Sequence, residues 1–319
     1  MFNIILMRKK IVIIFLVFFI PLISFSQSDN SYNLDFGLKL GVSNYIGDIG
    51  GDDKKAQAFV LDMKMQETRW SIGGYARYKI GKPDAVKTPW SVEVQLNWIR
   101  ISGADSLTKN YSPRKIRNLT FRNDIVQLNM MGEWSFFESA NLGKDDNSEK
   151  NLSAYGCTGL SIFYQDPYAY NPYHYLGLPT WVSLHGLITE AQLYSGSFHL
   201  IQPGIPFGAG VNYTFKKKYR IGWSITWTKT FTDYLDGISG NYPSQAQWNS
   251  LTPEEKYFSS RIASLPDVDP APNGLRGNSL GHDSFITSTI NVGYIIQYHS
   301  VKELPSSKEI MMKESGAKY

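Results

Sequence analysis

Apolar and polar residues alternate one by one along most of the chain. Trp90–Trp98 shows the pattern best, with Trp, Val and Leu at every second position and Ser, Glu, Gln and Asn between them. A period of two is the signature of a strand whose two faces meet different surroundings. The alternation predicts eight strands, which cover Asn33–Tyr45, Arg69–Ile80, Trp90–Ile101, Asp124–Phe137, Leu152–Tyr164, Phe207–Phe215, Tyr219–Phe231 and Phe285–Tyr298.

The lengths of the connections indicate which kind of β protein this is. Three connections are comparatively short, namely Gly81–Pro89, Glu138–Asn151 and Lys216–Lys218. They alternate with four longer ones, which are Ile46–Thr68, Ser102–Asn123, Gln165–Pro206 and Thr232–Ser284. Outer-membrane barrels have short periplasmic turns and long external loops, and most of the predicted strands are long enough to cross the hydrocarbon layer. We therefore predict an all-β fold, an eight-stranded antiparallel transmembrane outer-membrane β-barrel with long extracellular loops.

The two faces of the predicted strands differ in composition. Bulky aromatic and aliphatic residues fill one face, and Gly, Ser, Thr and charged residues dominate the other. A barrel of eight strands has room inside only for side chains, which argues against a general porin. Aromatic girdles belong at the strand ends, where the sequence places Trp70, Tyr78, Trp90, Trp98, Trp134 and Tyr219. A secreted soluble β-sandwich or lipocalin-like barrel, with its apolar face inward, is the alternative.

Glycine and proline mark the expected loop edges. Gly41, Gly47 and Gly50 allow the first strand to bend out into a loop. Pro203 and Pro206 have no N–H to donate to a ladder, so we place them at the loop edge before the sixth strand.

The first 26 residues have the build of a secretory signal. Arg8, Lys9 and Lys10 precede the apolar run Ile11–Ile20 and the small-residue stretch Ser24–Ser26. We predict a signal peptide over 1–26, a barrel over 27–298 and a flexible periplasmic tail over 299–319, with an uncleaved N-terminal anchor as the alternative. Cleavage removes three of the 32 basic residues and none of the 28 acidic ones, leaving 29 against 28. A nearly neutral chain without a clustered basic face gives no sign of nucleic-acid binding. The mean hydropathy of −0.26 argues only against membrane-spanning helices.

Candidate chemistry is sparse. The single cysteine, Cys157, excludes a disulfide framework, and the five histidines have no zinc-ligand spacing. Two acidic groups have calcium-loop composition without its spacing, namely Asp48, Asp52 and Asp53, and Asp267, Asp269 and Asn273. Asp233 and Asp236 would form an acid–histidine pair with His282 if their loops meet, as a barrel-type hydrolase requires. We expect no cofactor, no metal and no catalytic residues.

Five segments resemble a known family. They are Gly41–Asp48, Arg117–Asp124, Ile205–Gly210, Lys229–Asp236 and Arg276–Asn278. In order and spacing they are similar to the PorG-like outer-membrane barrels of Bacteroidota, which belong to the type IX secretion system. The stretch Gln245–Pro272 and the tail depart from the family pattern. From these segments we single out as candidate interaction residues Asn44, Tyr45, Asp48, Arg117, Asn118, Arg122, Asp124, Pro206, Phe207, Lys229, Asp233, Tyr234, Asp236 and Arg276.

The resemblance implies a non-enzymatic subunit in the outer membrane. Its implied partners are the periplasmic ring subunits, a lipoprotein and its partner, together with outer-membrane lipids. That machinery exports proteins with a C-terminal sorting domain and, in gliding species, motility adhesins. The five segments fall at the external rim, whereas a periplasmic ring would meet the short turns, so they either shape and plug the barrel or contact external components. The alternatives are a barrel enzyme or small-ligand barrel, and an adhesin or barrel of the OmpA/OmpW type.

Overall fold

A computed structural model describes residues 33–50, 65–80, 89–108, 117–139, 151–172, 180–193, 197–216, 218–261, 274–279 and 281–297. These residues belong to one compact unit, Tyr32–Gln297. The predicted signal peptide and C-terminal tail lie outside the described residues. So do Asp52, Asp53 and the group around Asp267.

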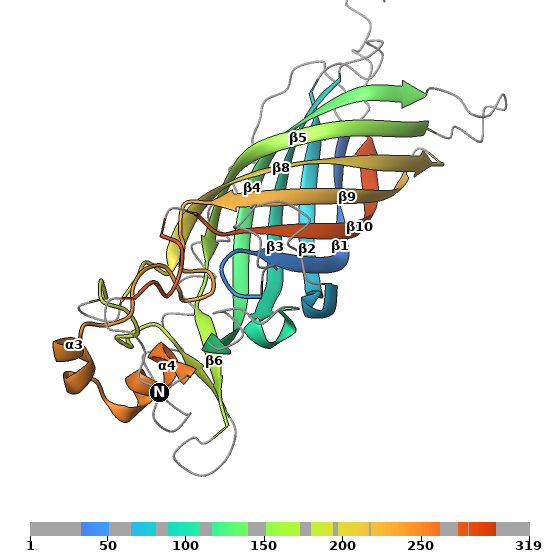
Figure 1. Cartoon of the computed structure of the whole chain (residues 1–319). Helices are drawn as coiled ribbons and strands as arrows, with labels where there is room; N and C mark the ends of the chain where they lie inside the picture. Colours follow the sequence, from blue (N-terminus) through green and yellow to red (C-terminus); the bar gives the residue numbers. More distant parts are fainter. Residues whose placement is uncertain are drawn as a thin grey trace, which may run out of the picture. The chain divides into compact units, whose positions relative to one another are not determined.

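Eight antiparallel strands pair side by side in the order β3-β2-β1-β10-β9-β8-β5-β4, and a further pairing of β3 with β4 closes the ring (Figure 1). They are β1 (Asn33–Ile46), β2 (Arg69–Lys79), β3 (Trp90–Ala104), β4 (Thr120–Ser139), β5 (Asn151–Tyr164), β8 (Ile201–Phe215), β9 (Tyr219–Thr230) and β10 (Ser284–Gln297). The predicted fold, an eight-stranded antiparallel barrel, is confirmed. Within the described residues, no helix is long and apolar enough to cross a membrane.

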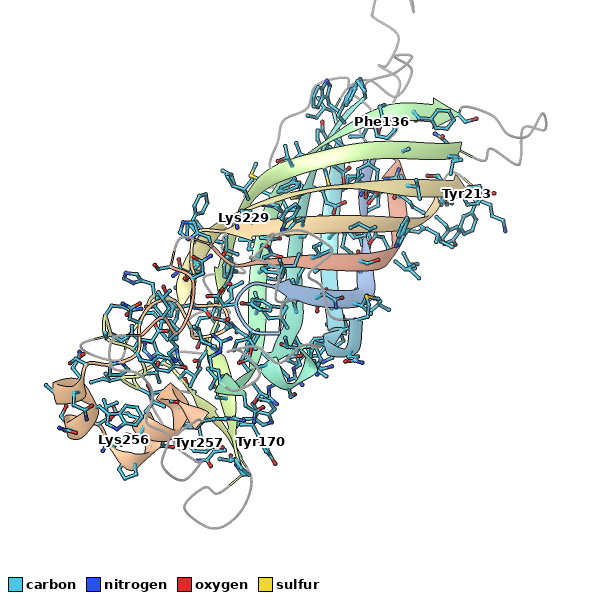
Figure 2. All side chains as sticks on the ribbon, viewed as in Figure 1. Phe136, Tyr170, Tyr213, Lys229, Lys256 and Tyr257 are labelled. Carbon is cyan, nitrogen blue, oxygen red and sulfur yellow. The ribbon has the colours of Figure 1, made fainter. Side chains whose placement is uncertain are left out.

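Smaller elements gather at the external end of the barrel, where the long connections lie. A hairpin of β6 (Pro167–Asn171) and β7 (Thr180–Ser183) continues the sheet beyond β4. The helices α3 (Gln245–Ser250) and α4 (Pro253–Ser259) lie in the loop between β9 and β10, and short 3-10 turns cover Met65–Glu67 and Asp105–Leu107. Figure 2 shows Tyr170, Tyr257 and Lys256 at this end, opposite Phe136 and Tyr213.

The prediction that Pro203 and Pro206 precede the sixth barrel strand is wrong. Both lie within β8, which begins at Ile201. The β8–β9 ladder starts only at Gly204, so Pro203 needs no donor on that side. On the other side, the β5–β8 pairing is interrupted between Thr158–Phe207 and Ser161–Gly204, where Pro206 supplies no N–H. The sheet tolerates these prolines because its ladder has gaps where they stand.

The outer face of the barrel is apolar, as the alternation predicts. Along β1, Phe36, Leu38 and Leu40 are exposed, whereas Asp35 and Lys39, at alternating positions, are buried in the lumen. Aromatic pairs mark both ends of the barrel wall: the rings of Trp70 and Trp98 are 4.6 Å apart, and those of Trp90 and Trp134 are 6.4 Å apart. An exposed apolar band between two aromatic girdles is the surface of a barrel that spans an outer membrane.

Charged side chains fill the periplasmic half of the lumen. Lys39 lies 2.6 Å from Glu93, and Arg77 contacts Asp35, Glu93 and Glu133. Arg220 forms a further ion pair with Asp35. Three cations thus meet three carboxylates, and Glu93 is fully buried. Each of these charges therefore has a partner of opposite sign, as buried charges require.

Candidate functional site

The long connections fold into one cap at the external end of the barrel. We use "external cap" for the described residues of 46–50, 105–119, 184–193, 231–261 and 274–283. Leu235 and Ile238 of this cap pack against the apolar side chains that line the lumen at its external end. The resulting core consists of Tyr45, Ile49, Ile99, Ile101, Leu119, Phe121, Ile125, Phe163, Leu235, Ile238 and Phe285. The lumen is therefore charged in its lower part and closed by an apolar plug above.

Local sequence explains how the loop after β9 enters the lumen. Asp236 accepts a hydrogen bond from the backbone N–H of Ile238 at 2.8 Å, which is an Asx turn. Gly237 between them has φ of 76°, a conformation that favours glycine. The Asn123 side chain then donates to the carbonyl of Leu235 at 2.8 Å and fixes the turn to the barrel wall.

Arg117 joins three separate loops of the external cap. Its guanidinium makes a bidentate ion pair with Asp105 at 2.8 and 2.9 Å. It also donates to the backbone carbonyl of Asp48 at 3.0 Å and to that of Arg276. Burial works against the charge of Arg117, but the neighbouring Asp105 outweighs burial and holds the pKa of Arg117 above its ordinary value. Planar guanidinium groups suit such multiple contacts.

Arg276 has the same role on the other side of the cap. It is buried, forms an ion pair of 2.7 Å with Glu190, and donates to the carbonyls of Gly237, Phe258 and Ser259. Glu190 also accepts the backbone N–H groups of Ser239 at 2.8 Å and Gly240 at 3.2 Å. Arg276 therefore ties α4 and the loop after β9 to the loop that carries Glu190.

Tyr45 lies at the centre of an acidic cluster beneath these arginines. Its hydroxyl is 2.7 Å from Asp236 and 2.8 Å from Asp283, and it accepts the backbone N–H of Asp48 at 2.9 Å. Asp283 also accepts the backbone N–H of Leu235 at 3.0 Å. We use "acidic cluster" for Asp48, Asp233, Asp236 and Asp283 around Tyr45.

Three carboxyl groups of the acidic cluster, those of Asp233, Asp236 and Asp283, have raised pKa values. Burial, followed by the charge of Asp48, raises the pKa of Asp236 to about 7. Burial and the charge of Asp236 raise the pKa of Asp233 to about 9, against a smaller opposing contribution from Ser239. The same two causes raise the pKa of Asp283 well above its ordinary value. These shifts follow from placing like charges together in a region that excludes water.

Residues from several of the family-like segments lie together at the external end of the barrel. Other residues of these segments lie elsewhere. Eight of the candidate interaction residues lie in the external cap or the acidic cluster, namely Tyr45, Asp48, Arg117, Asn118, Asp233, Tyr234, Asp236 and Arg276. Asn44 lies beside them and donates to the hydroxyl of Thr68 at 2.9 Å. Tyr234 stacks on Phe198 with ring centroids 5.1 Å apart.

Asn118 and the remaining candidate residues lie away from the acidic cluster. Asn118 is exposed with φ of 51°. On the outer face of β4, the Arg122 guanidinium lies 4.6 Å from the Trp181 ring, and Asp124 pairs with Arg100 at 2.6 and 2.8 Å.

Strands β8 and β9 carry the last three of these candidates. Pro206 is paired within the sheet, and Phe207 packs against Trp227 on the outer face with ring centroids 5.1 Å apart. Lys229 donates to the carbonyl of His282. The family-like segments therefore serve the barrel wall as well as the cap.

The acid–histidine pair that a rim hydrolase requires is not formed. The two loops do meet, since the N–H of Asp283 donates to the carbonyl of Thr232 at 3.0 Å. His282 is nevertheless exposed, and in the described part of the chain no hydrogen bond joins its ring to a carboxylate. Across the described ranges, no three His, Cys, Asp or Glu side chains are placed to hold one metal ion.

Comparisons with known proteins bear on the barrel only. No protein-family model matches the chain, and no curated protein matches it. Solved structures similar to it include Ail, the attachment invasion locus protein of Yersinia pestis, in complex with the heparin analogue sucrose octasulfate. That match has a TM-score of 0.34 and 8% identity and covers 84% of this chain and 99% of that chain. Neisserial surface protein A gives a TM-score of 0.30 and 7% identity, over 84% and 97%. At these identities, no residue role is transferred to the cap.

Sequence reasoning missed three groups that the cap depends on. Asp105 and Glu190, the partners of the two buried arginines, stand in loops without any motif spacing. Asp283 follows His282 directly in the sequence, and its partner is Tyr45 at the end of β1. The sequence does show Asp residues close to the strand ends. Their positions do not reveal which residues far away in the sequence are their partners.

Proposed function

We propose that this chain is a non-enzymatic outer-membrane barrel that acts through its two ends, as a subunit of the type IX protein secretion machinery. The observation that carries the proposal is the filled lumen, with ion pairs in one half and an apolar plug in the other. A barrel without a passage has only its surfaces with which to act. The family resemblance of the segments that build the cap supports the specific machinery.

The location follows from the barrel wall and the N-terminal sequence. The exposed apolar band and the aromatic girdles fit the outer membrane of a Gram-negative cell, with outer-membrane lipids around the barrel. The signal-like residues 1–26 support export and cleavage before residue 27.

The implied partners are the periplasmic ring subunits, a lipoprotein and its partner. They would meet the short turns of the barrel, such as the turn between β8 and β9, where Lys216 and Lys218 stand. The external cap lies at the opposite end, so its buried residues shape the barrel and do not form the contact with the ring. In this arrangement the barrel anchors the ring to the outer membrane.

Crosslinking in native membranes tests the proposal. Crosslinks from a cysteine placed at Lys216 should capture ring subunits, and those from one placed at the external residue Lys256 should not. Deletion of the gene should also block release of cargo that carries the sorting domain. Normal secretion in the deletion strain, or equal capture from both positions, would refute the role.

A small-ligand or adhesin barrel is the second candidate, because one open cavity lies among the external loops. It has a volume of about 510 Å³ and is lined by His185, Ser197, Phe198, His199, Leu200 and Ile201. Binding of cell-surface glycans by the purified wild-type protein, lost in a His185→Ala, His199→Ala variant, would favour this function over the secretion role.

A further inference from the structure

We propose that the external cap is closed by bound protons and opens as the pH rises above neutrality. The site is the bridge Asp236–Tyr45–Asp283, which joins the loop after β9, the end of β1 and the start of β10. The proposal concerns regulation of the cap and does not depend on the secretion role.

The hydrogen bonds around Tyr45 require an extra proton. The phenol hydroxyl has one hydrogen, yet carboxyl oxygens of both Asp236 and Asp283 lie within 2.8 Å of it. The hydroxyl can donate to only one of them. The other contact is a hydrogen bond only if that carboxyl group is protonated and donates to the phenol oxygen, which also accepts the N–H of Asp48. At least one of the two aspartates therefore carries a proton when the cap is closed.

Asp233 gives independent support. It is only 7% exposed, and neither of its carboxyl oxygens has a hydrogen-bond partner among the described residues. A buried ionised carboxylate without a partner is costly, whereas a neutral carboxylic acid is tolerated far better.

The two buried arginines of the surrounding elements are paired with carboxylates outside the acidic cluster. Arg117 from the β3–β4 connection pairs with Asp105, and Arg276 pairs with Glu190 from the β7–β8 connection. Tyr242 from the loop after β9 is buried nearby but is neutral. Both guanidinium groups already have carboxylate partners outside the cluster, and the charge of Arg117 lowers the pKa of Asp236 less than burial and the charge of Asp48 raise it.

Loss of the bridging proton should separate the elements that it joins. With both carboxylates ionised, Asp236 and Asp283 repel each other across Tyr45. As they move apart, the hydrogen bonds that they accept from the backbone N–H groups of Ile238 and Leu235 should break. Replacing Asp236 or Asp283 by asparagine puts a neutral amide in place of the carboxyl group. The cap should then stay closed at every pH. Because closure depends on one proton, cap opening should increase about tenfold for each pH unit above the transition.

The test uses the full chain in detergent micelles or lipid nanodiscs. Infrared spectra should show the carbonyl stretch of protonated carboxyl groups at pH 6, and this band should weaken as the pH rises to 9, with the contribution of Asp233 lost last. In parallel, hydrogen exchange of the Leu235 and Ile238 amides, corrected for intrinsic rates, should accelerate over the same range. Asp236→Asn and Asp283→Asn should each remove this acceleration. Asp124→Asn, on the outer face, should behave like the wild type.

Several results would overturn the proposal. One is the absence of a protonated-carboxyl band at pH 6, and another is a band unchanged in the Asp236→Asn, Asp283→Asn double variant. A band that appears only after a chelator is added would show that a cation neutralises the cluster. Electrophoretic mobility of unheated samples verifies that each variant barrel is folded, and the two single variants provide independent readings if one does not fold.

Discussion

Two buried arginines hold the external cap together in the same way. Arg117 and Arg276 each take one carboxylate and several backbone carbonyls from loops that are far apart in the sequence. The contribution of each arginine to stability depends on the carboxylate that it neutralises, because removing one member of a buried pair leaves the other charge without compensation.

The Arg276→Ala variant should loosen the cap and leave the barrel intact. The buried charge of Glu190, left without a cation, would cost about 3–5 kcal/mol, as found for broken buried pairs. Hydrogen exchange of the Ser239 and Gly240 amides, which donate to Glu190, measures the effect. Lys256→Ala on α4 is the matched control and should change stability by less than about 0.5 kcal/mol. Unchanged protection in Arg276→Ala would contradict this account of the cap.

Asp233 should make stability depend on pH. Its pKa is raised from its ordinary value to about 9 in the folded protein, so the folded state binds more protons than the unfolded chain between these values. The stabilisation is full at acidic pH and is lost as the pH rises through about 9. Thermal unfolding in detergent at pH 5 and pH 10 should show a smaller decrease for Asp233→Asn than for the wild type. An equal decrease in both proteins would mean that another group carries the dependence.

Alternation predicted the barrel strands because each one lies between lipid and lumen. The signal fails where a strand leaves the membrane: β4 begins at Thr120, four residues before the prediction, and its inward residues there contact the cap. The helices α3 and α4 were missed although Ser244–Gln247 and Thr252–Glu255 form capping boxes. Helices this short carry too little periodicity to be recognised without those caps.

Thr252→Ala should destabilise α4 locally. The hydroxyl of Thr252 accepts the Glu255 N–H at 3.2 Å, and loss of such a cap costs about 1 kcal/mol. Faster exchange of the α4 amides, with unchanged exchange in β9, is the expected result. Thr252→Ser retains the cap and serves as the control. A uniform effect over the whole barrel would show that α4 is not an independent local unit.

The molecule as a whole is a closed ring with a filled interior. The sequence predicts the ring from strand number and loop lengths, but it does not predict that the lumen is charged below and apolar above. Lys39 on β1 pairs with Glu93 on β3, a strand that is not its neighbour, so nothing in their spacing identifies them as partners. Arg77 and Glu93 stand directly opposite each other on the neighbouring strands β2 and β3, but the alternation alone does not fix that register. The pairing of β2 with β3 sets Arg77 opposite Glu93, and Lys39 reaches the same carboxylate across β2.

Purified protein in planar bilayers should therefore show no steady conductance. The ion pairs of Arg77 and the apolar core around Leu235 occupy the two halves of the lumen. The protein should nevertheless migrate differently in detergent gels before and after boiling, as a folded barrel does. Stable discrete channel openings by the wild-type protein would disprove the closed lumen, and identical mobility would count against a barrel.

The ion pair between Asp35 and Arg220 bears on how the barrel is assembled. Asp35 lies on the first strand and Arg220 on β9, so the pair spans the seam where the two ends of the sheet meet through β10. Before β1 pairs with β10, the ion pair between Asp35 and Arg220 cannot form. Their attraction therefore stabilises the finished ring and no earlier intermediate. An assembly factor that holds the seam open would be opposed by this pair, and release of the barrel into the membrane would coincide with its formation.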